Sequence, residues 1–217
     1  MLDYGVIGDG VVDDTSKIQS VVNLDKNTFF PAGNYRVEGN KGINLKSNRT
    51  YFGDGDGDGD GTIFSMFETS LAQVQYLAIF NCWNSVSSLT LSNVIIKDMR
   101  MTTINPSAFV NTYSGGIVVY NADKCVIDNV TFDNFRASGI FIYGESLLTQ
   151  SKNIVVKNCY FDNWDPTLNA TQSFGAVHLG SHSTGCTVEN NIILCKVAHG
   201  IALYDGYTGG VSIKHNM

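Results

Sequence analysis

Most of the chain alternates apolar and polar residues over short stretches, which is the pattern of β-strands. Only residues 13–24 have a helical period, because Ile18, Val21 and Val22 recur at intervals of three and four residues. Asp13 and Asp14 precede them, and we expect their carboxylates to accept hydrogen bonds from the first free amides of a short helix. The rest of the chain is predicted to form short strands rich in Val, Ile, Phe and Tyr, separated by Gly, Asn, Asp and Ser.

One alternating segment recurs along the chain: two apolar positions, a polar residue, Asn, and a second short apolar run. The copies are residues 88–96, 124–132, 153–161, 185–193 and 210–217. We align the asparagines of the first four copies in one column and place a histidine there in the last copy. The column is Asn93, Asn129, Asn158, Asn190 and His215. Asn suits a bend at this position, since it tolerates a left-handed backbone and its amide can bond to the next copy.

A second segment, with one or two small residues followed by an alternating apolar strand and a turn, accompanies the first. It occurs at residues 115–121, 138–144, 175–181 and 199–205. Units of roughly 25 to 36 residues with two strands and a fixed bend are typical of a parallel β-solenoid, whose strands pair with their copies about 4.8 Å away. The alternative is a β-sandwich, which normally repeats at 8 to 12 residues and uses more hairpin turns. We therefore predict one continuous all-β domain, with residues 1–65 as N-terminal cap and first coils and residues 66–217 as further coils.

Composition excludes several classes of protein. The 217 residues carry a net charge of -6 with a pI near 5.0, the wrong sign for a nucleic-acid partner. No apolar run approaches the ~18 residues of a membrane span, so we expect no membrane insertion. The start has no basic stretch followed by an apolar core, which predicts either synthesis in the cytoplasm without a visible signal peptide or a leader that has been removed. Five irregularly spaced cysteines are predicted to be buried, reduced thiols.

The N-terminal third of the chain resembles a known family. The runs DYGVIGDGVVDDTSKIQ (3–19), FFPAGNYRV (29–37) and GDGDGDGDGTIF (53–64) resemble, in this order, the opening of the pectate-lyase-like superfamily of right-handed parallel β-helices. That superfamily includes polygalacturonases, lyases, glucanases and bacteriophage tailspikes. The resemblance implies a short helix that covers the first coil, a polysaccharide partner, and a location on a virion tail or outside the cell.

The last residues, VSIKHNM, stop inside a repeat, where the apolar edge of a solenoid is normally covered. We therefore expect either a fragment of a longer polypeptide, truncated before a C-terminal cap, or an oligomer that covers this coil. Since tailspikes of the superfamily are trimeric, the resemblance favours a homotrimer.

Two groups of residues in the sequence have side chains of the kinds that bind metal ions. Asp54, Asp56, Asp58 and Asp60 alternate with glycines, but no Glu stands at the twelfth position of an EF-hand loop, so only a weak calcium site is predicted there. His178, His182 and His199 lack a regular ligand spacing. We predict no cofactor and no metal elsewhere.

The strands of the second segment gather aromatic and ionisable residues on one face. Their alternate positions predict an outward column of Val118, Phe141, His178 and Ala202, and next to it a column of Tyr120, Tyr143, Gly180 and Tyr204. Tyrosine rings are platforms for sugars, so Tyr120, Tyr143, His178 and Tyr204 are the predicted substrate-binding residues. Trp83 and Trp164 are expected to pack rather than to bind sugar.

The turns after these strands carry the predicted catalytic residues, Glu145, His182 and Asp205. We assign Glu145 and His182 to the same turn position in successive coils, roughly 5 Å apart. Asp205 lies two coils beyond Glu145, roughly 9 to 10 Å away, near the upper end of the separation in inverting glycosidases. The runs Ala198–Gly200 and Ser212–Lys214 resemble two polygalacturonase motifs, but the paired aspartates that precede them in that family are absent.

We therefore predict a polysaccharide-binding and polysaccharide-degrading β-helix, a hydrolase or a lyase of the tailspike depolymerase type. The alternative is a non-catalytic carbohydrate-binding or structural adhesion module. A secreted lyase of plant polymers is disfavoured, because neither a leader nor a calcium-plus-arginine arrangement is visible.

Overall fold

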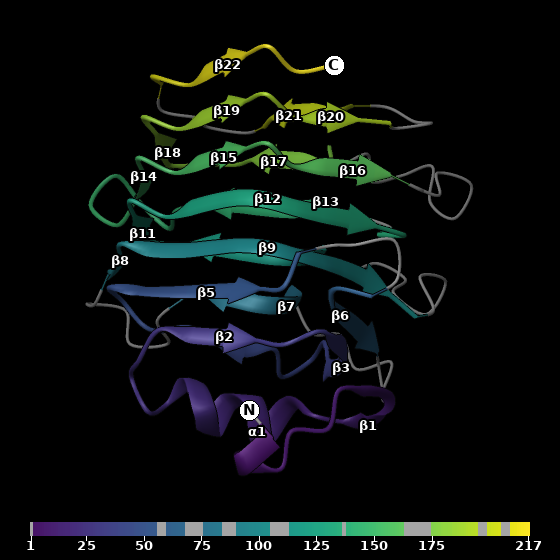
Figure 1. Cartoon of the computed structure of the whole chain (residues 1–217). Helices are drawn as coiled ribbons and strands as arrows, with labels where there is room; N and C mark the ends of the chain where they lie inside the picture. The colour runs from purple at the N-terminus through teal and green to yellow at the C-terminus, as the bar shows by residue number, and fades with distance from the viewer. Residues whose placement is uncertain are drawn as a thin grey trace.

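The chain winds into a stack of coils, with the N-terminus at one end of the stack and the C-terminus at the other (Figure 1). The computed structural model describes residues 2–55, 60–67, 76–83, 90–104, 113–135, 138–162, 175–194, 199–204 and 209–217. The strands of each coil pair in parallel with those of the next, as between Ile117 and Ile140 and between Ile140 and Val177. The prediction of an all-β parallel solenoid is confirmed.

The described strands form three parallel sheets that run along the stack. The large sheet contains β1 (Asp9–Asp13), β2 (Thr28–Phe30), β3 (Gly33–Glu38), β5 (Arg49–Gly53), β6 (Thr62–Phe67), β9 (Val94–Thr103), β12 (Val126–Asp133), β15 (Val155–Lys157), β16 (Tyr160–Asp162), β19 (Thr187–Glu189), β20 (Ile192–Ile193) and β22 (Ser212–Lys214). The six-stranded sheet contains β4 (Ile43–Asn44), β7 (Tyr76–Cys82), β10 (Tyr113–Tyr120), β13 (Ser138–Tyr143), β17 (Val177–Leu179) and β21 (Ile201–Leu203). The four-stranded sheet contains β8 (Leu91–Ser92), β11 (Ala122–Asp123), β14 (Ser151–Lys152) and β18 (Ser183–Thr184).

Helix α1 (Thr15–Val22) follows the short 3-10 helix η1 (Leu2–Tyr4) and covers the N-terminal end of the stack (Figure 1). It buries Ile18, Val21 and Val22, as their spacing predicted. Asp13 caps the helix, since its Oδ1 accepts the Thr15 amide at 2.9 Å. The prediction for Asp14 is wrong: its buried carboxylate accepts the amides of Ile7 and Gly8 at 2.9 Å each and so fixes the preceding turn. No helix among the described residues is long and apolar enough to cross a membrane.

The core lies inside the coils and is aromatic near the N-terminus. The Phe64 ring lies 4.9 Å from the rings of both Phe30 and Phe80, so it joins strands of the large and six-stranded sheets. In later coils Phe132 stacks on Phe161 at 4.9 Å. Within the described part of the chain, the cysteines are buried free thiols, as predicted: Cys82, Cys125, Cys159 and Cys186. Cys195 lies outside it.

One bend of the large sheet repeats in every later coil and confirms most of the predicted asparagine column. Asn129, Asn158, Asn190 and His215 have left-handed φ values of 53°, 54°, 56° and 49°. The assignment of Asn93 to this column is wrong. Lys97 pairs with Asp128, so Asp98 is the neighbour of Asn129 in the preceding coil, and its φ is 58°.

Asn93 belongs to a different bend, where the four-stranded sheet meets the large sheet. Arg49 pairs with Val94, which places Asn48 beside Asn93, and the Asn93 amide donates to Asn48 Oδ1 at 2.8 Å. The left-handed backbone of both residues made the two bends look alike in sequence. The predicted amide-to-amide bond between coils is therefore present, although at this second bend.

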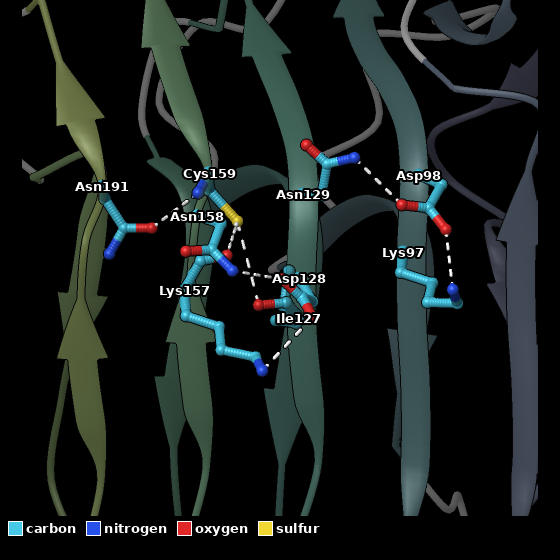
Figure 2. Close-up of polar contacts among 9 residues, drawn as sticks. All are labelled: Lys97, Asp98, Ile127, Asp128, Asn129, Lys157, Asn158, Cys159 and Asn191. Carbon is cyan, nitrogen blue, oxygen red and sulfur yellow. Dashed lines mark hydrogen bonds and ion pairs between the residues drawn. The ribbon is translucent and has the colours of Figure 1, made fainter.

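In the first bend the side-chain bonds between coils run from asparagine to aspartate (Figure 2). Asn129 Nδ2 donates to Asp98 Oδ1 at 2.9 Å, and Asn158 Nδ2 donates to Asp128 Oδ1 at 2.7 Å. Burial acts to raise the pKa of Asp98, but hydrogen bonds from Asn129 and Lys97 outweigh it and hold this pKa below its usual value. Asparagine thus both forms the bend and joins one coil to the one before it.

Beside this bend, side chains of opposite charge alternate from coil to coil. The register of the large sheet aligns Lys97, Asp128, Lys157, Glu189 and Lys214, which we call the charged column. Lys157 Nζ lies 3.3 Å from Asp128 Oδ2 (Figure 2). Four of these side chains are partly exposed and Lys214 is exposed, so each pair adds little to stability, but together they favour one stacking order.

Candidate functional site

The outer face of the six-stranded sheet carries the two predicted columns in the predicted register. Val118 pairs with Phe141, Phe141 with His178, and His178 with Ala202. In the second column Tyr120 pairs with Tyr143. Ile142 pairs with Leu179 and Leu179 with Leu203, so Gly180 stands between Tyr143 and Tyr204.

Six rings from these columns form a chain of contacts across the coils. Neighbouring ring centroids are 5.5 Å apart for Trp83 and Tyr120, 4.5 Å for Tyr120 and Tyr143, 5.3 Å for Tyr143 and Phe141, 4.5 Å for Phe141 and His178, and 5.8 Å for His178 and Tyr204. We call this set the aromatic run. It extends from the strand β7 to the strand β21, across five successive coils.

The aromatic run is buried in its middle and exposed at its ends. Phe141 and His178 are buried, although the sequence predicted that their column faces solvent. Their side chains do point outward, but they pack with Ala78 and Val118 in a small apolar cluster separate from the main core, against which Tyr120 and Tyr143 lie. The outer rings remain accessible: Tyr204 is 62% exposed and Trp83 is 38% exposed. The accessible surface therefore consists mainly of the ring edges and faces of the second column.

Burial determines the charge of His178. It lowers the pKa of this imidazole to about 4, from 6.5. His178 is therefore neutral near pH 7, with one ring nitrogen that donates and one that accepts. The imidazole lies flat on Phe141, with 14° between the ring planes. It can offer a hydrogen bond to a neutral polar group without adding a charge to the face.

The turn after β13 holds Glu145 beside the aromatic run. The Glu145 amide donates to Asn121 Oδ1 at 2.9 Å, and Asn121 Nδ2 donates to Glu145 Oε2 at 3.4 Å. Ser146 and Thr149 close the loop with a contact of 2.8 Å between their hydroxyls. Glu145 is exposed, so its carboxylate is available at the rim of the face.

The predicted equivalence of Glu145 and His182 is wrong. The Gly144 amide donates to the Ser181 carbonyl, and Ser151 pairs with Ser183. Residues 145–149 are thus a loop that the following coil lacks, and His182 aligns with Gln150, directly after that loop. His182 has a left-handed φ of 55° and makes the bend of its own coil.

Several predicted residues cannot be placed relative to this face. Asp205 and Trp164 lie outside the described residues, and so do Asp56 and Asp58 of the predicted calcium loop. Asp54 and Asp60 are exposed. In the described parts of the chain, no group of three or more His, Cys, Asp or Glu side chains is arranged to hold a metal ion. Calcium binding therefore stays a weak prediction.

Sequence reasoning assigned Trp83 to packing and so missed its place in the aromatic run. Val119 pairs with Cys82, so the next residue of each strand, Tyr120 and Trp83, are neighbours in the second column. The sequence contained part of this alignment. Trp83 directly follows the apolar strand β7, and Tyr120 is the last residue of the apolar strand β10. The variable length of the segment between these strands hid the alignment.

Comparison with known proteins assigns the family. A family model described as right handed beta helix region matches residues 78–217. The chain belongs to the right-handed parallel β-helix family. A second model, described as Rhamnogalacturonase A/epimerase, pectate lyase-like, matches residues 1–74. The resemblance to the pectate-lyase-like superfamily that the N-terminal motifs indicated is therefore confirmed.

Individual relatives of this β-helix protein have several functions. The plasmin and fibronectin-binding protein A of Streptococcus pneumoniae (strain ATCC BAA-255 / R6) is 26% identical over 175 residues, which are 73% of this chain and 23% of that protein. The A-module of the mannuronan C-5 epimerase AlgE6 of Azotobacter vinelandii is 20% identical with a TM-score of 0.69, over 99% of this chain and 54% of the module. The pre-mature gene product 12 of bacteriophage phi29 is 16% identical with a TM-score of 0.63, over 100% of this chain and 32% of that protein.

The chain spans about a quarter of the length of the pneumococcal relative and about half of the epimerase module. At these identities the solved structures establish the shared fold.

Proposed function

We propose that this β-helix protein binds a polysaccharide along the outer face of its six-stranded sheet. The observation that carries the proposal is the aromatic run, which sets six rings in contact across five coils with its ends exposed. Sugar rings have apolar faces that lie on aromatic side chains, while the phenol, indole and imidazole groups can hydrogen-bond to sugar hydroxyls. A linear face that spans four strand spacings, roughly 19 Å, suits a polymer better than a small metabolite.

The relatives support a polysaccharide ligand. The A-module of a mannuronan epimerase, which acts on a polysaccharide, shares the fold over 99% of this chain. The phage protein and the pneumococcal plasmin and fibronectin-binding protein support a place on a virion or outside a cell, and we propose such a location. A homotrimer, as in tailspikes, remains part of this proposal.

Removal of one half-buried and one exposed ring from the aromatic run should weaken polysaccharide binding. We expect the double variant Tyr120→Ala with Tyr204→Ala to bind about 10 to 100 times more weakly than the wild type, since each of the two lost aromatic contacts contributes roughly 0.5 to 1.5 kcal/mol. Affinity electrophoresis in gels with mannuronan, polygalacturonate, hydroxyethyl cellulose or soluble starch measures this directly. The matched control is Tyr160→Ala, because Tyr160 is a partly buried tyrosine in β16 of the large sheet. Unretarded migration of the wild type in all four gels contradicts the proposal.

We further propose that the bound chain is cleaved, with Glu145 and Asp205 as acid and base. The structure supports the position of Glu145, which is exposed at the rim of the aromatic run and fixed by Asn121. Asp205 directly follows Tyr204 of the run in sequence. Two carboxylates on opposite sides of a glycosidic bond are the arrangement that hydrolysis needs.

Neutral amides at these two positions should abolish cleavage and leave binding intact. We expect Glu145→Gln and Asp205→Asn each to lower the rate by about 100-fold or more, the usual contribution of a positioned acid or base. Reducing-end release detects a hydrolase, and absorbance of an unsaturated uronate detects a lyase. Glu189→Gln, in the charged column on another face, serves as the control. A polysaccharide that binds but is never cut supports the adhesion module instead.

A further inference from the structure

The six-stranded sheet differs from the large sheet in its charged residues. None of its strands, β4, β7, β10, β13, β17 and β21, contains Lys, Arg, Asp or Glu. The strands of the large sheet carry both signs, for example at Arg36, Asp133 and Lys157. The face that holds the aromatic run is therefore built from uncharged strands.

Lysines described near this sheet lie outside its strands. Lys41 and Lys46 flank β4, which pairs with β7 at one end of the sheet, so they lie beyond the strands of the aromatic run. Lys41 forms an ion pair with Glu38. Lys152 belongs to the four-stranded sheet, where it is in register with Asp123. The strands that carry the run therefore present no ammonium or guanidinium group.

The environment of the run is unfavourable for an anion. His178 is neutral near pH 7, because burial lowers its pKa to about 4. It lies against Phe141, which packs with Val118 in the small apolar cluster. Glu145 adds a negative charge at the rim, where Asn121 fixes its position. An anionic group of a ligand placed on this face loses water without meeting a cation, and the Glu145 carboxylate repels it.

We propose that the polysaccharide bound along the aromatic run is neutral, a polymer of uncharged hexopyranoses. This inference rests on the proposed function. Sugar hydroxyls can donate to the Glu145 carboxylate, while the apolar faces of the sugars lie on the rings. A polyuronate carries a carboxylate on every sugar, so several would lie along a face of roughly 19 Å. A mannuronan epimerase module shares the fold, but at 20% identity the fold does not determine which polymer binds.

Oligosaccharides that differ only in charge test this assignment. Carboxyl reduction of mannuronan and galacturonan hexasaccharides converts each uronate to a neutral hexose and retains the linkages. Isothermal titration at low ionic strength compares the two acids, their reduced forms, cellohexaose and maltohexaose. We expect the tightest neutral hexasaccharide to bind at least tenfold more tightly than either acid.

The outcomes separate the inference from the proposed function. An acid that binds within tenfold of the tightest neutral hexasaccharide, or more tightly than all of them, overturns the neutral ligand and leaves polysaccharide binding established. If no hexasaccharide of either kind binds, the proposed function fails and this inference fails with it.

Two variants with the same change in net charge show whether this face makes the distinction. Because the chain has a net charge of -6, it can repel a polyanion from any side. Glu145→Gln removes a charge at the rim of the run, and Glu189→Gln removes one from the charged column of the large sheet. We expect only Glu145→Gln to raise the affinity for the acids, about threefold at low ionic strength and less in salt, with neutral binding changed less than twofold.

Titrations followed by nuclear magnetic resonance of the tyrosine rings measure these affinities, including weak ones. Equal gains in Glu145→Gln and Glu189→Gln would show that net charge alone excludes the acids, and would overturn the role of the uncharged face.

Discussion

Phe64→Ala should lower the free energy of unfolding by about 3 to 5 kcal/mol, the usual range for loss of a buried phenylalanine. The Phe64 ring is fully buried and contacts Phe30, Tyr35 and Phe80, at centroid distances of 4.9, 5.3 and 4.9 Å. Alanine leaves a cavity where the large sheet meets the six-stranded sheet. Urea unfolding should show a lower midpoint with an unchanged slope, because the surface exposed on unfolding hardly changes.

The control for this prediction is Phe29→Ala. Phe29 lies in β2 of the same sheet, but its side chain points outward, is 43% exposed and contacts Phe52 at a centroid distance of 5.2 Å. We expect this variant to lose less than about 1.5 kcal/mol, since it leaves no internal cavity. Equal losses in the two variants would show that Phe64 does not lie in a tightly packed core.

Asn191→Leu should destabilise the protein by about 2 to 4 kcal/mol, although leucine has nearly the same size. The buried Asn191 side chain accepts the Cys159 amide at 2.8 Å (Figure 2). It also donates to the Val156 carbonyl at 3.2 Å and to Asn216 Oδ1 at 2.9 Å. Leucine leaves the Cys159 amide and the Val156 carbonyl without this partner in the interior, at a cost of about 1 to 2 kcal/mol for each group. Asn216 Oδ1 still accepts the Asn191 backbone amide at 3.0 Å. Urea unfolding measures the total, and faster hydrogen exchange of the Cys159 amide locates it.

Asn44→Leu is the matched control, because Asn44 is an exposed residue of the strand β4. Its stability should change by less than about 0.5 kcal/mol. If Asn191→Leu is as stable as this control, with slow exchange of the Cys159 amide retained, the bonds of Asn191 contribute nothing.

The solenoid could be predicted because its bends leave a chemical signature. A left-handed backbone favours asparagine, so Asn129, Asn158 and Asn190 recur at the length of one coil. The same signature produced the error at Asn93, since two bends of the coil have this backbone conformation. Only the pairing of Lys97 with Asp128 distinguishes them, and in this coil the bend residue is Asp98. Backbone conformation was therefore predictable, while the identity of the bend required the register.

The sequence predicted the strand register of the candidate site, but it did not predict which side chains of the site are buried. Tyr120, Tyr143, Gly180 and Tyr204 align as the strand pattern indicated. The burial of His178 depends on how neighbouring rings fold over it, which a one-dimensional pattern does not contain. The predicted position of His182 depended on counting residues through a turn, and the inserted residues 145–149 made that count wrong.

The charged column constrains how this protein can change in length. The side chains of this column alternate in charge from coil to coil: Lys97, Asp128, Lys157, Glu189 and Lys214. Deletion of one internal coil would therefore place two like charges on adjacent strands, about 4.8 Å apart. Deletion of two consecutive coils preserves the alternation. Variants of this flank should therefore tolerate gain or loss of coils in even numbers better than in odd numbers.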